Sequence, residues 1–512
     1  MASCTVMALA ACGISQASPS DSTDSDTTSS ATTKKIPEGS RVDIFVPSDG
    51  ITLTQNTPTN KWGSFTSAVT KQLEEEGYAS DSVNVTASGS LKDQAQALEQ
   101  LVSDVTADAG DEGASSNSDT HDVVLLAPAL TLDSETKQFG DLIGDGSGHL
   151  EKASTVSATL TADQQEEQEE AEKSIVASSA ALRKAGDTIV LVSRHLPGVV
   201  ADGFVKTSDA YDIGALQANQ LAKKLELSEA TAQNPKRIEI VIPKESNTTI
   251  SSDFFRGVWS VLGPYFKAGS VISGSGRVTK TSSAASWKRV LLEADSATTA
   301  QAGFEEILDA SSDARSTGSP VKLDGVIASN DFLAAQVSNV LKDRGYTGSA
   351  ADINPEITIG GIVGNITGNS DLNKDKVPSP SAEEDSPSSS LNSGDDDSDS
   401  DSSSDEAQQW PIVTGFGSYA SNVQLVVSGK QWLTGLENRT ALATDVAKAC
   451  ADVARHAKLT VSKASGSYAS SSVTLKGHKV AVITRSLVGV TGSNLKTALI
   501  DTGYVSAADA GL

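Results

Sequence analysis

Cysteine, basic residues and long hydrophobic runs are all scarce in this 512-residue sequence. Its three cysteines, Cys4, Cys12 and Cys450, are too few for a disulfide framework or a cysteine-based metal cluster. Lysine and arginine total 40 against 66 aspartates and glutamates, so the formal net charge is -26 and no basic patch is found for a nucleic acid. No stretch is long and apolar enough to span a bilayer as a helix. These absences exclude disulfide-stapled, nucleic-acid-binding and membrane-spanning classes.

Signatures of catalysis are missing as well. The glycine-rich stretches "GDGSGHL" and "ITIGGIVGN" fit neither a dinucleotide-binding fingerprint nor a P-loop. The sequence has no nucleophile elbow and no clustered His, Cys and Asp set for a metal. We therefore expect neither an enzyme nor a bound cofactor or metal ion.

The amino terminus carries an apolar segment, "MASCTVMALAACG". Its Leu-Ala-Ala-Cys ending resembles a bacterial lipobox, in which Cys12 would become the lipidated first residue of the mature protein. We interpret residues 1–12 as a lipoprotein signal segment and residues 13–40, rich in Ser, Thr and Asp, as a disordered tether. The protein would then be extracytoplasmic and anchored to the cell membrane. An ordinary cleaved or disordered terminus is the alternative.

From Arg41 onward, apolar strands alternate with helical patterns. The strands "RVDIFVP", "SVNVTAS", "HDVVLLAPA" and "DTIVLVS" form a first series, and "RIEIVIP", "LDGVIAS" and "WPIVTGF" belong to a second. Alternation of this kind predicts parallel sheets covered by helices on both faces. Two successive doubly wound halves predict two α/β lobes joined by several crossings, with a ligand site in the cleft between them.

An acidic insertion interrupts the second half. Between Asp371 and Glu406 there are twelve Asp or Glu residues against two Lys. Such a run cannot bury enough apolar surface to pack in a core. We predict that residues 369–409 form a disordered surface excursion.

The stretch "GVIASNDFLA" marks a strand that ends in small polar residues before a helix begins. In open α/β sheets, ligands bind at the carboxyl ends of parallel strands. Asp331 could accept two hydroxyl groups of a ligand through charge-assisted hydrogen bonds. Alternatively it could cap the helix, a role that Ser329 or Asn330 could share.

Five motifs occur in this order: "NKWGSF", "LVSRH", "GVIASNDFLA", "WPIVTGFGSYASNVQLVVSGKQWLTGL" and "VITRSLVGVTGSNLKTALIDTGYV". Their order, with that of the strands and helices, resembles the periplasmic sugar-binding proteins of ABC transporters, in particular the xylose- and glucose-type branch. The resemblance implies a type I periplasmic-binding-protein-like fold. The first lobe would comprise residues 41–203 and 418–472, the second lobe residues 204–417, and residues 473–512 would form a tail that crosses to the second lobe.

This resemblance also implies a function. A monomeric binding protein would close its lobes on a small polar ligand, most simply a monosaccharide, and present it to the membrane subunits of an ABC permease. Two alternatives stay open. One is a lipoprotein that senses a ligand for a membrane signalling partner. The other is a scaffold or adhesion protein whose cleft has lost its ligand.

Matching motifs give candidate ligand-binding residues. Trp62 follows the first strand, and its ring could stack on a sugar face or pack in the core. Lys61 beside it is a ligand candidate or a solvated charge. Arg194 stands at a strand end, where its donors could meet hydroxyls or a carboxylate, or form a structural salt bridge. Asn330 and Asp331 match the family's Asn-Asp motif.

Several positions depart from the family pattern. Ser193 replaces the aspartate expected before Arg194, and Phe416 and Gly417 replace a Gln-Asp pair. Glu437 occupies the place of an expected basic residue, unless it is a solvated loop charge. We therefore expect Phe416 to add apolar surface to the pocket and Glu437 to favour a neutral or cationic ligand.

Overall fold

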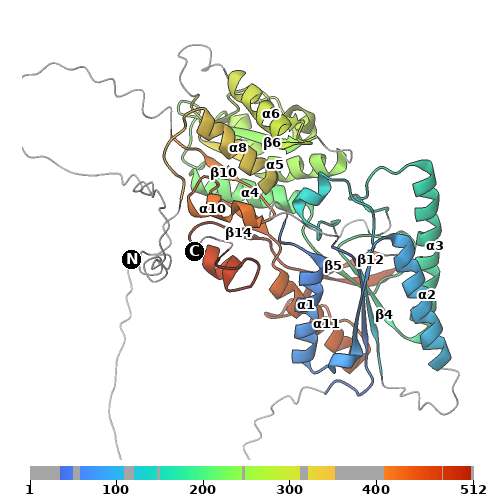
Figure 1. The fold of residues 1–512 in the computed structure, drawn as a ribbon. Helices are drawn as coiled ribbons and strands as arrows, with labels where there is room; N and C mark the ends of the chain where they lie inside the picture. The colour runs from blue at the N-terminus through green and yellow to red at the C-terminus, as the bar shows by residue number, and fades with distance from the viewer. Residues whose placement is uncertain are drawn as a thin grey trace, which may run out of the picture. The chain divides into compact units, whose positions relative to one another are not determined.

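The computed structural model describes most of the chain from residue 35 onward (Figure 1). The described residues from Ile36 belong to one compact unit. Cys12, nearly all of the predicted tether and nearly all of the acidic insertion lie outside the described residues, as does the predicted strand "ITIGGIV". The described ranges are 35–49, 58–108, 120–146, 150, 152–244, 248–311, 321–351, 409–475 and 477–508.

A seven-stranded sheet forms the first lobe, in the order β12-β13-β5-β4-β3-β1-β2. Every neighbouring pair is parallel except the antiparallel hairpin β12–β13. The strands are β1 (Val42–Pro47), β2 (Val83–Ser88), β3 (Val123–Leu126), β4 (Thr188–Val192), β5 (Gly203–Lys206), β12 (Ala469–Leu475) and β13 (His478–Thr484).

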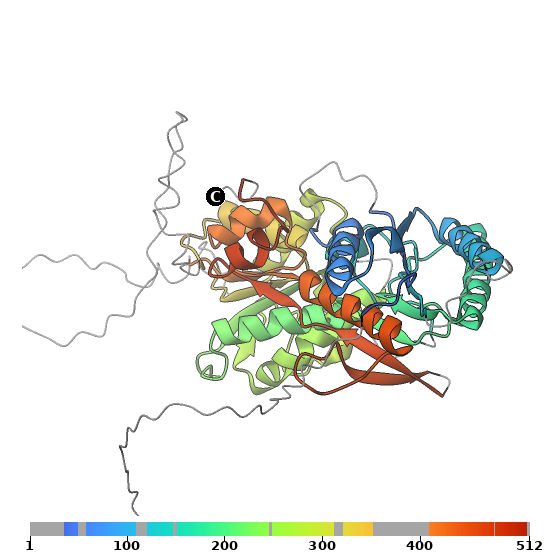
Figure 2. The same cartoon turned by 90° about the horizontal axis from the view of Figure 1, so that it is seen from below.

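Helices cover both faces of this sheet because its strands alternate apolar side chains between them. In β1, Ile44 and Val46 point toward one core and Phe45 toward the other. The first face packs against α1 (Trp62–Glu76) and α11 (Arg439–His456), which lie side by side (Figure 2). The second face packs against α2 (Leu91–Asp108) and α3 (Ala162–Ala185).

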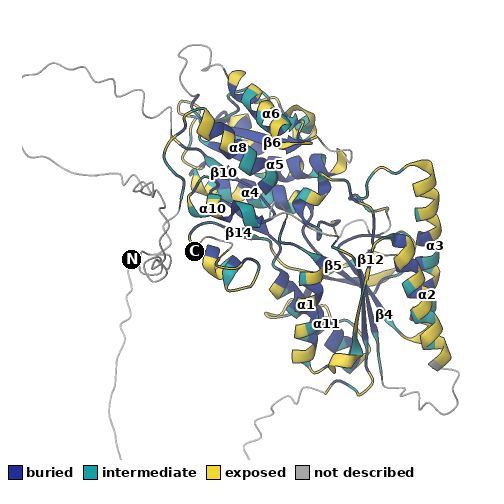
Figure 3. Ribbon diagram, in the orientation of Figure 1, coloured by how far each residue is buried: buried dark blue, intermediate teal, exposed yellow. Residues whose placement is uncertain are grey.

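The second lobe has a five-stranded parallel sheet whose buried faces are also covered by helices (Figure 3). Helices α4 (Ala210–Lys224) and α5 (Thr248–Ala268) cover one face, and α6 (Ala297–Asp309) and α8 (Asp331–Asp343) cover the other. The strands are β6 (Lys236–Pro243), β7 (Val271–Ile272), β8 (Leu291–Leu292), β9 (Gly325–Ala328) and β10 (Ile412–Thr414).

Smaller elements complete the fold. The antiparallel pair β11 (Thr434–Leu436) and β14 (Val488–Val490) shares a small apolar cluster with α10 (Val423–Val427). The short helices are η1 (Ser80–Ser82), η2 (Thr136–Phe139), η4 (Ala284–Val290), η7 (Ala420–Asn422) and the π-helical η8 (Lys496–Ile500).

Apart from residues 131–146, which reach the second lobe between β3 and α3, the described chain passes between the two lobes three times: from β5 to α4, from β11 to α11, and from β13 to β14. The predicted fold class, two largely parallel α/β lobes with several crossings, is confirmed. The crossings differ from the predicted positions 417 and 472. Residues 418–436 stay with the second lobe because Trp432 and Leu433 pack in its core. The hairpin β12–β13 stays with the first lobe because β13 pairs with β5.

Two glycines let α4 and α5 approach closely. A Cβ atom at Gly257 would lie 2.0 Å from the carbonyl oxygen of Tyr211, and one at Gly214 would lie 2.2 Å from that of Phe254. Alanine improves helix propensity by about 1 kcal/mol, but a clash with backbone forces the helices apart. We expect Gly257→Ala to lower the free energy of unfolding by about 1–3 kcal/mol, measured by chemical denaturation.

Gly303→Ala is the matched control for this contact. Gly303 is also helical, but its added Cβ would meet the side chain of Leu292 at 3.3 Å and the backbone oxygen of Glu293 at 3.9 Å, neither of which is a clash. We expect little change or a small gain. Equal stability of the two variants would show that the α4–α5 approach is not as close as described.

Candidate functional site

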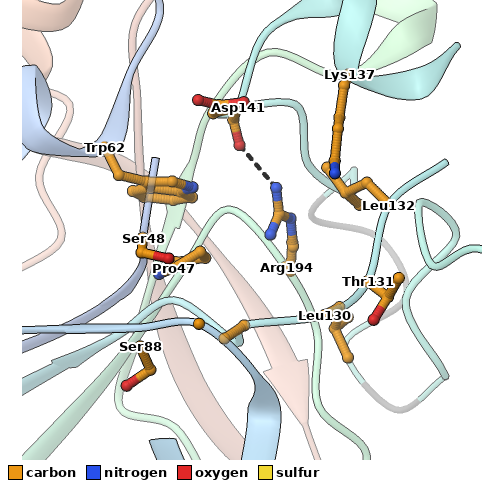
Figure 4. Close-up of a pocket in the computed structure, with 12 residues that line it drawn as sticks. Pro47, Ser48, Trp62, Ser88, Leu130, Thr131, Leu132, Lys137, Asp141 and Arg194 are labelled. Carbon is orange, nitrogen blue, oxygen red and sulfur yellow. Dashed lines mark hydrogen bonds between the residues drawn. The ribbon is translucent and has the colours of Figure 1, made fainter. Parts of the chain in front are cut away.

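A cavity of about 160 Å³ opens at the carboxyl-terminal edge of the first sheet (Figure 4). This is the edge at which open α/β sheets bind ligands. The lining comes from the ends of β1 and β2, from the segment after β3, from the start of α1, and from Arg194, which follows β4. The lining residues are Pro47, Ser48, Trp62, Ser88, Gly89, Ala129, Leu130, Thr131, Leu132, Lys137, Asp141 and Arg194.

Trp62 is the first residue of α1, and it both packs in the core and lines the cavity. Its side chain is 1% exposed and meets Phe65 edge-on, with ring centroids 6.1 Å apart. Its indole Nε1 has no hydrogen-bond partner among the described residues. The guanidinium of Arg194 lies 5.6 Å from the centroid of the Trp62 ring. The two interpretations of Trp62, core and ligand contact, are therefore compatible in this structure.

Arg194 is buried behind the cavity, with an exposed fraction of 1%. Its guanidinium donates hydrogen bonds to the backbone oxygens of Asp141 at 2.7 Å and of Ile143 and Pro128 at 3.3 Å. Among the described residues, no carboxylate oxygen forms a salt bridge with it. Burial lowers the pKa of Arg194 to about 10. It is thus a buried cation held by carbonyl groups, not a member of the structural salt bridge that the sequence left open.

The other charged side chains near the cavity differ in whether they form ion pairs. Lys61 forms a 2.9 Å ion pair with the Asp141 carboxylate and is not among the lining residues. Burial raises the pKa of Asp141, and the Lys61 ammonium opposes that shift. Lys137, on η2, is exposed and forms no ion pair among the described residues. The cavity lining therefore has one carboxylate that is paired, and two cations, Lys137 and Arg194, that form no ion pair with any described residue.

Asn330 and Asp331 lie in the second lobe and do not line this cavity. Asn330 is the helix cap, because its Oδ1 accepts a hydrogen bond from the Leu333 amide at 2.9 Å. Asp331 is 0% exposed, and its carboxylate accepts from the Tyr419 amide, Gln431 Nε2 and Thr434 Oγ1. Burial raises the pKa of Asp331 to about 6. The carboxylate joins α8 to residues 419–434.

Phe416 and Glu437 also lie away from the cavity. Phe416 is 0% exposed in the core of the second lobe. Glu437 is 0% exposed at the second crossing, where its Oε2 accepts from the Ser208 amide of the first crossing at 2.5 Å. Burial raises the pKa of Glu437 to about 7. The expectation of a neutral or cationic ligand depended on Glu437 facing the pocket, so it loses its basis.

Sequence reasoning missed residues 131–146, which we call the strap. The strap follows β3 of the first lobe, yet Phe139 is 0% exposed in the core of the second lobe, 6.1 Å from the Phe254 ring. The Gln138 side chain accepts a hydrogen bond from Asn330 Nδ2 at 3.0 Å, and its carbonyl accepts from the Tyr419 hydroxyl at 2.7 Å. The strap thus connects the lobes beside the predicted ligand residue Asn330.

The described part of the chain has neither a metal-binding cluster nor a membrane-spanning helix. It contains no group of three or more His, Cys, Asp or Glu residues arranged to hold a metal ion. None of its helices combines the length and apolar character needed to cross a membrane.

No protein-family model matches the chain, and no curated protein sequence is significantly similar to it. Its structural neighbours are sugar solute-binding proteins of ABC transporters. One, from Clostridium phytofermentans with bound β-D-glucose, is 20% identical, with a TM-score of 0.48 over 92% of this chain and 99% of that one. A second, from Chloroflexus aurantiacus in complex with D-glucose, is 18% identical, with a TM-score of 0.47 over 91% and 97%. A periplasmic ribose ABC transporter protein from Conexibacter woesei is 10% identical, with a TM-score of 0.47 over 91% and 96%.

Proposed function

We propose that this protein captures a small polar ligand, a monosaccharide, in the first-lobe cavity. The observation that carries the proposal is the indole N–H of Trp62, which lines the cavity, is buried and has no hydrogen-bond partner among the described residues. An unsatisfied buried donor destabilises a protein by about 1–3 kcal/mol. A ligand oxygen would satisfy it, and the indole ring offers apolar surface to a CH-rich sugar face.

The size of the cavity supports a single small solute. Its volume of about 160 Å³ is many times the roughly 10–15 Å³ that a single water molecule needs by the same measure. Hydroxyl-bearing residues Ser48, Ser88 and Thr131 are part of its lining. Hydroxyl groups donate and accept hydrogen bonds, as the hydroxyls of a sugar require.

The ligand would be passed to an ABC permease in the cell membrane. The lipobox-like segment ending at Cys12 supports anchoring of a monomeric protein on the extracytoplasmic side of that membrane. The absence of catalytic motifs from the sequence supports a binding protein over an enzyme.

A thermal-shift screen of neutral and acidic monosaccharides tests the proposal. A ligand at one hundred times its dissociation constant adds roughly 2.7 kcal/mol to the free energy of unfolding, so the melting temperature should rise. Trp62→Phe keeps a ring but removes the N–H donor, and should weaken binding several-fold. Trp287→Phe is the matched control. Trp287 is half-buried on η4 and does not line the cavity, so this change should leave binding unchanged. A panel in which no sugar raises the melting temperature would contradict the proposal.

The strap favours a second candidate, a scaffold whose lobes do not move. Phe139 packs in the second-lobe core, and the Gln138 side chain accepts a hydrogen bond from Asn330, so the strap ties the two lobes together. Small-angle scattering with and without the ligand found in the screen separates the candidates. A smaller radius of gyration with the ligand supports hinge closure, and an unchanged radius supports lobes that do not move.

A further inference from the structure

We infer that the ligand of the first-lobe cavity carries a carboxylate, as a uronate or another acidic monosaccharide does. The inference rests on the proposed function and specifies its ligand class. Its starting point is the guanidinium of Arg194, which is 1% exposed and lines the cavity without forming a salt bridge among the described residues. Buried charges in proteins are normally paired, because an unpaired charge loses its hydration without compensation.

Three hydrogen-bond donors converge on this cavity from separate elements. Arg194 follows β4, Lys137 lies on η2, and the unpartnered indole N–H of Trp62 lies at the start of α1. Figure 4 shows the Lys137 amine and the Arg194 guanidinium on the same side of the cavity. Three carbonyl oxygens occupy three of the five N–H groups of Arg194, which leaves two.

Among the described residues, no carboxylate forms an ion pair with Lys137 or Arg194, although the Asp145 and Asp141 carboxylates stabilise the Arg194 cation at longer range. Asp141 is the acidic residue of the lining, and its carboxylate is paired with Lys61 at 2.9 Å. The Lys61–Asp141 pair is neutral as a whole, so Lys137 and Arg194 are the two charged lining residues that have no ion-pair partner among the described residues. A ligand carboxylate could accept hydrogen bonds from both, and hydrogen bonds to charged donors are roughly twice as strong as neutral ones.

The start of α1 favours a carboxylate over a phosphate. Phosphate groups bind readily to free amide N–H groups at helix N-termini. Here the amides of Trp62 and Gly63 already donate to the Asp49 carboxylate, at 2.6 and 2.8 Å. These amides are therefore not available to a ligand, and the Asp49 charge repels a dianion more strongly than a monoanion.

Isothermal titration calorimetry with matched pairs of ligands tests the inference. The pairs are D-glucuronate with D-glucose and D-galacturonate with D-galactose, and glucose 6-phosphate is the phosphate arm. We expect at least one acid to bind ten-fold or more tightly than its neutral partner. Lys137→Gln should lose about ten-fold in affinity for the acid and less than two-fold for the neutral sugar. Lys152→Gln, another exposed lysine on the segment after β3, is the matched control and should change neither.

The outcomes distinguish this inference from the proposed function. A neutral sugar that binds as tightly as its acid, or an acid whose affinity is unaffected by Lys137→Gln, overturns the carboxylate and leaves the sugar-binding function intact. Tighter binding of the sugar phosphate overturns the choice of carboxylate. If no member of the panel binds, the proposed function fails together with the inference.

Discussion

Phe139→Ala is expected to lower the free energy of unfolding by about 3–5 kcal/mol. The ring is 0% exposed and packs near Phe254 in the second-lobe core, although its backbone belongs to the strap that follows β3. Its removal leaves a cavity that rigid neighbours on α5 cannot fill completely. Chemical denaturation followed by circular dichroism measures the loss.

Phe332→Ala provides the comparison. Phe332 lies on α8 of the same lobe and is only half-buried, so the same truncation removes fewer contacts and should have a clearly smaller effect. Equal losses for the two variants would mean that Phe139 contributes no more than a surface phenylalanine. The strap would then not be part of the second-lobe core.

Glu437→Gln is expected to raise the melting temperature at pH 8 and to leave it nearly unchanged at pH 4. Burial raises the pKa of Glu437 from 4.5 to about 7, while Lys206 opposes and Asp212 reinforces the shift. The folded state therefore binds the proton more tightly than the unfolded state. The stability that the folded state gains by binding a proton at Glu437 is fully present below about pH 4.5 and is lost as the pH rises through about 7.

At about 1.4 kcal/mol per pKa unit, ionisation of this group removes roughly 3 kcal/mol by pH 8. Glutamine stays neutral and avoids that loss. Asp331, whose pKa is also raised by burial, titrates in parent and variant alike, so the two must be compared at each pH. Glu74→Gln, at an exposed position of α1, should match the parent at both values. A Glu437→Gln variant that is less stable than the parent at pH 8 would show that the ionised carboxylate stabilises the folded protein where the chain crosses between the lobes.

Local sequence pattern was sufficient to predict most of the fold. Alternating apolar residues in β1 and helical spacing in α1 each follow from nearest neighbours along the chain. The short strand β5, "GFVK", was not predicted. Its four residues begin at the glycine of an Asp-Gly pair and are too few to show a clear alternation of apolar and polar side chains. The crossing predicted at 472 was misplaced because it depends on the pairing of β13 with β5, which lie far apart in the sequence. The crossing predicted at 417 was misplaced because it depends on the packing of Trp432 and Leu433 in the second-lobe core.

The candidate site was predictable only in part. Trp62 and Arg194 both follow parallel strands of one sheet, so their proximity follows from topology. The burial of Glu437 depends on Ser208, 229 residues away, and no local pattern reveals such a contact. Phe139 was missed because the strap has neither strand nor helix periodicity, and its apolar residues become core only through tertiary packing.

The interleaved order of the lobes constrains how the protein can be made. The core on the α1 face of the first sheet includes residues of α11, which begins at Arg439, whereas β5 ends at Lys206. A ribosome that adds about 5–20 residues per second needs roughly 10–50 s to synthesise the intervening stretch. During that time the apolar face around Ile44 and Phe65 has no covering helix from α11. The nascent first lobe therefore presents a hydrophobic surface to chaperones or to an export machinery that accepts unfolded chains.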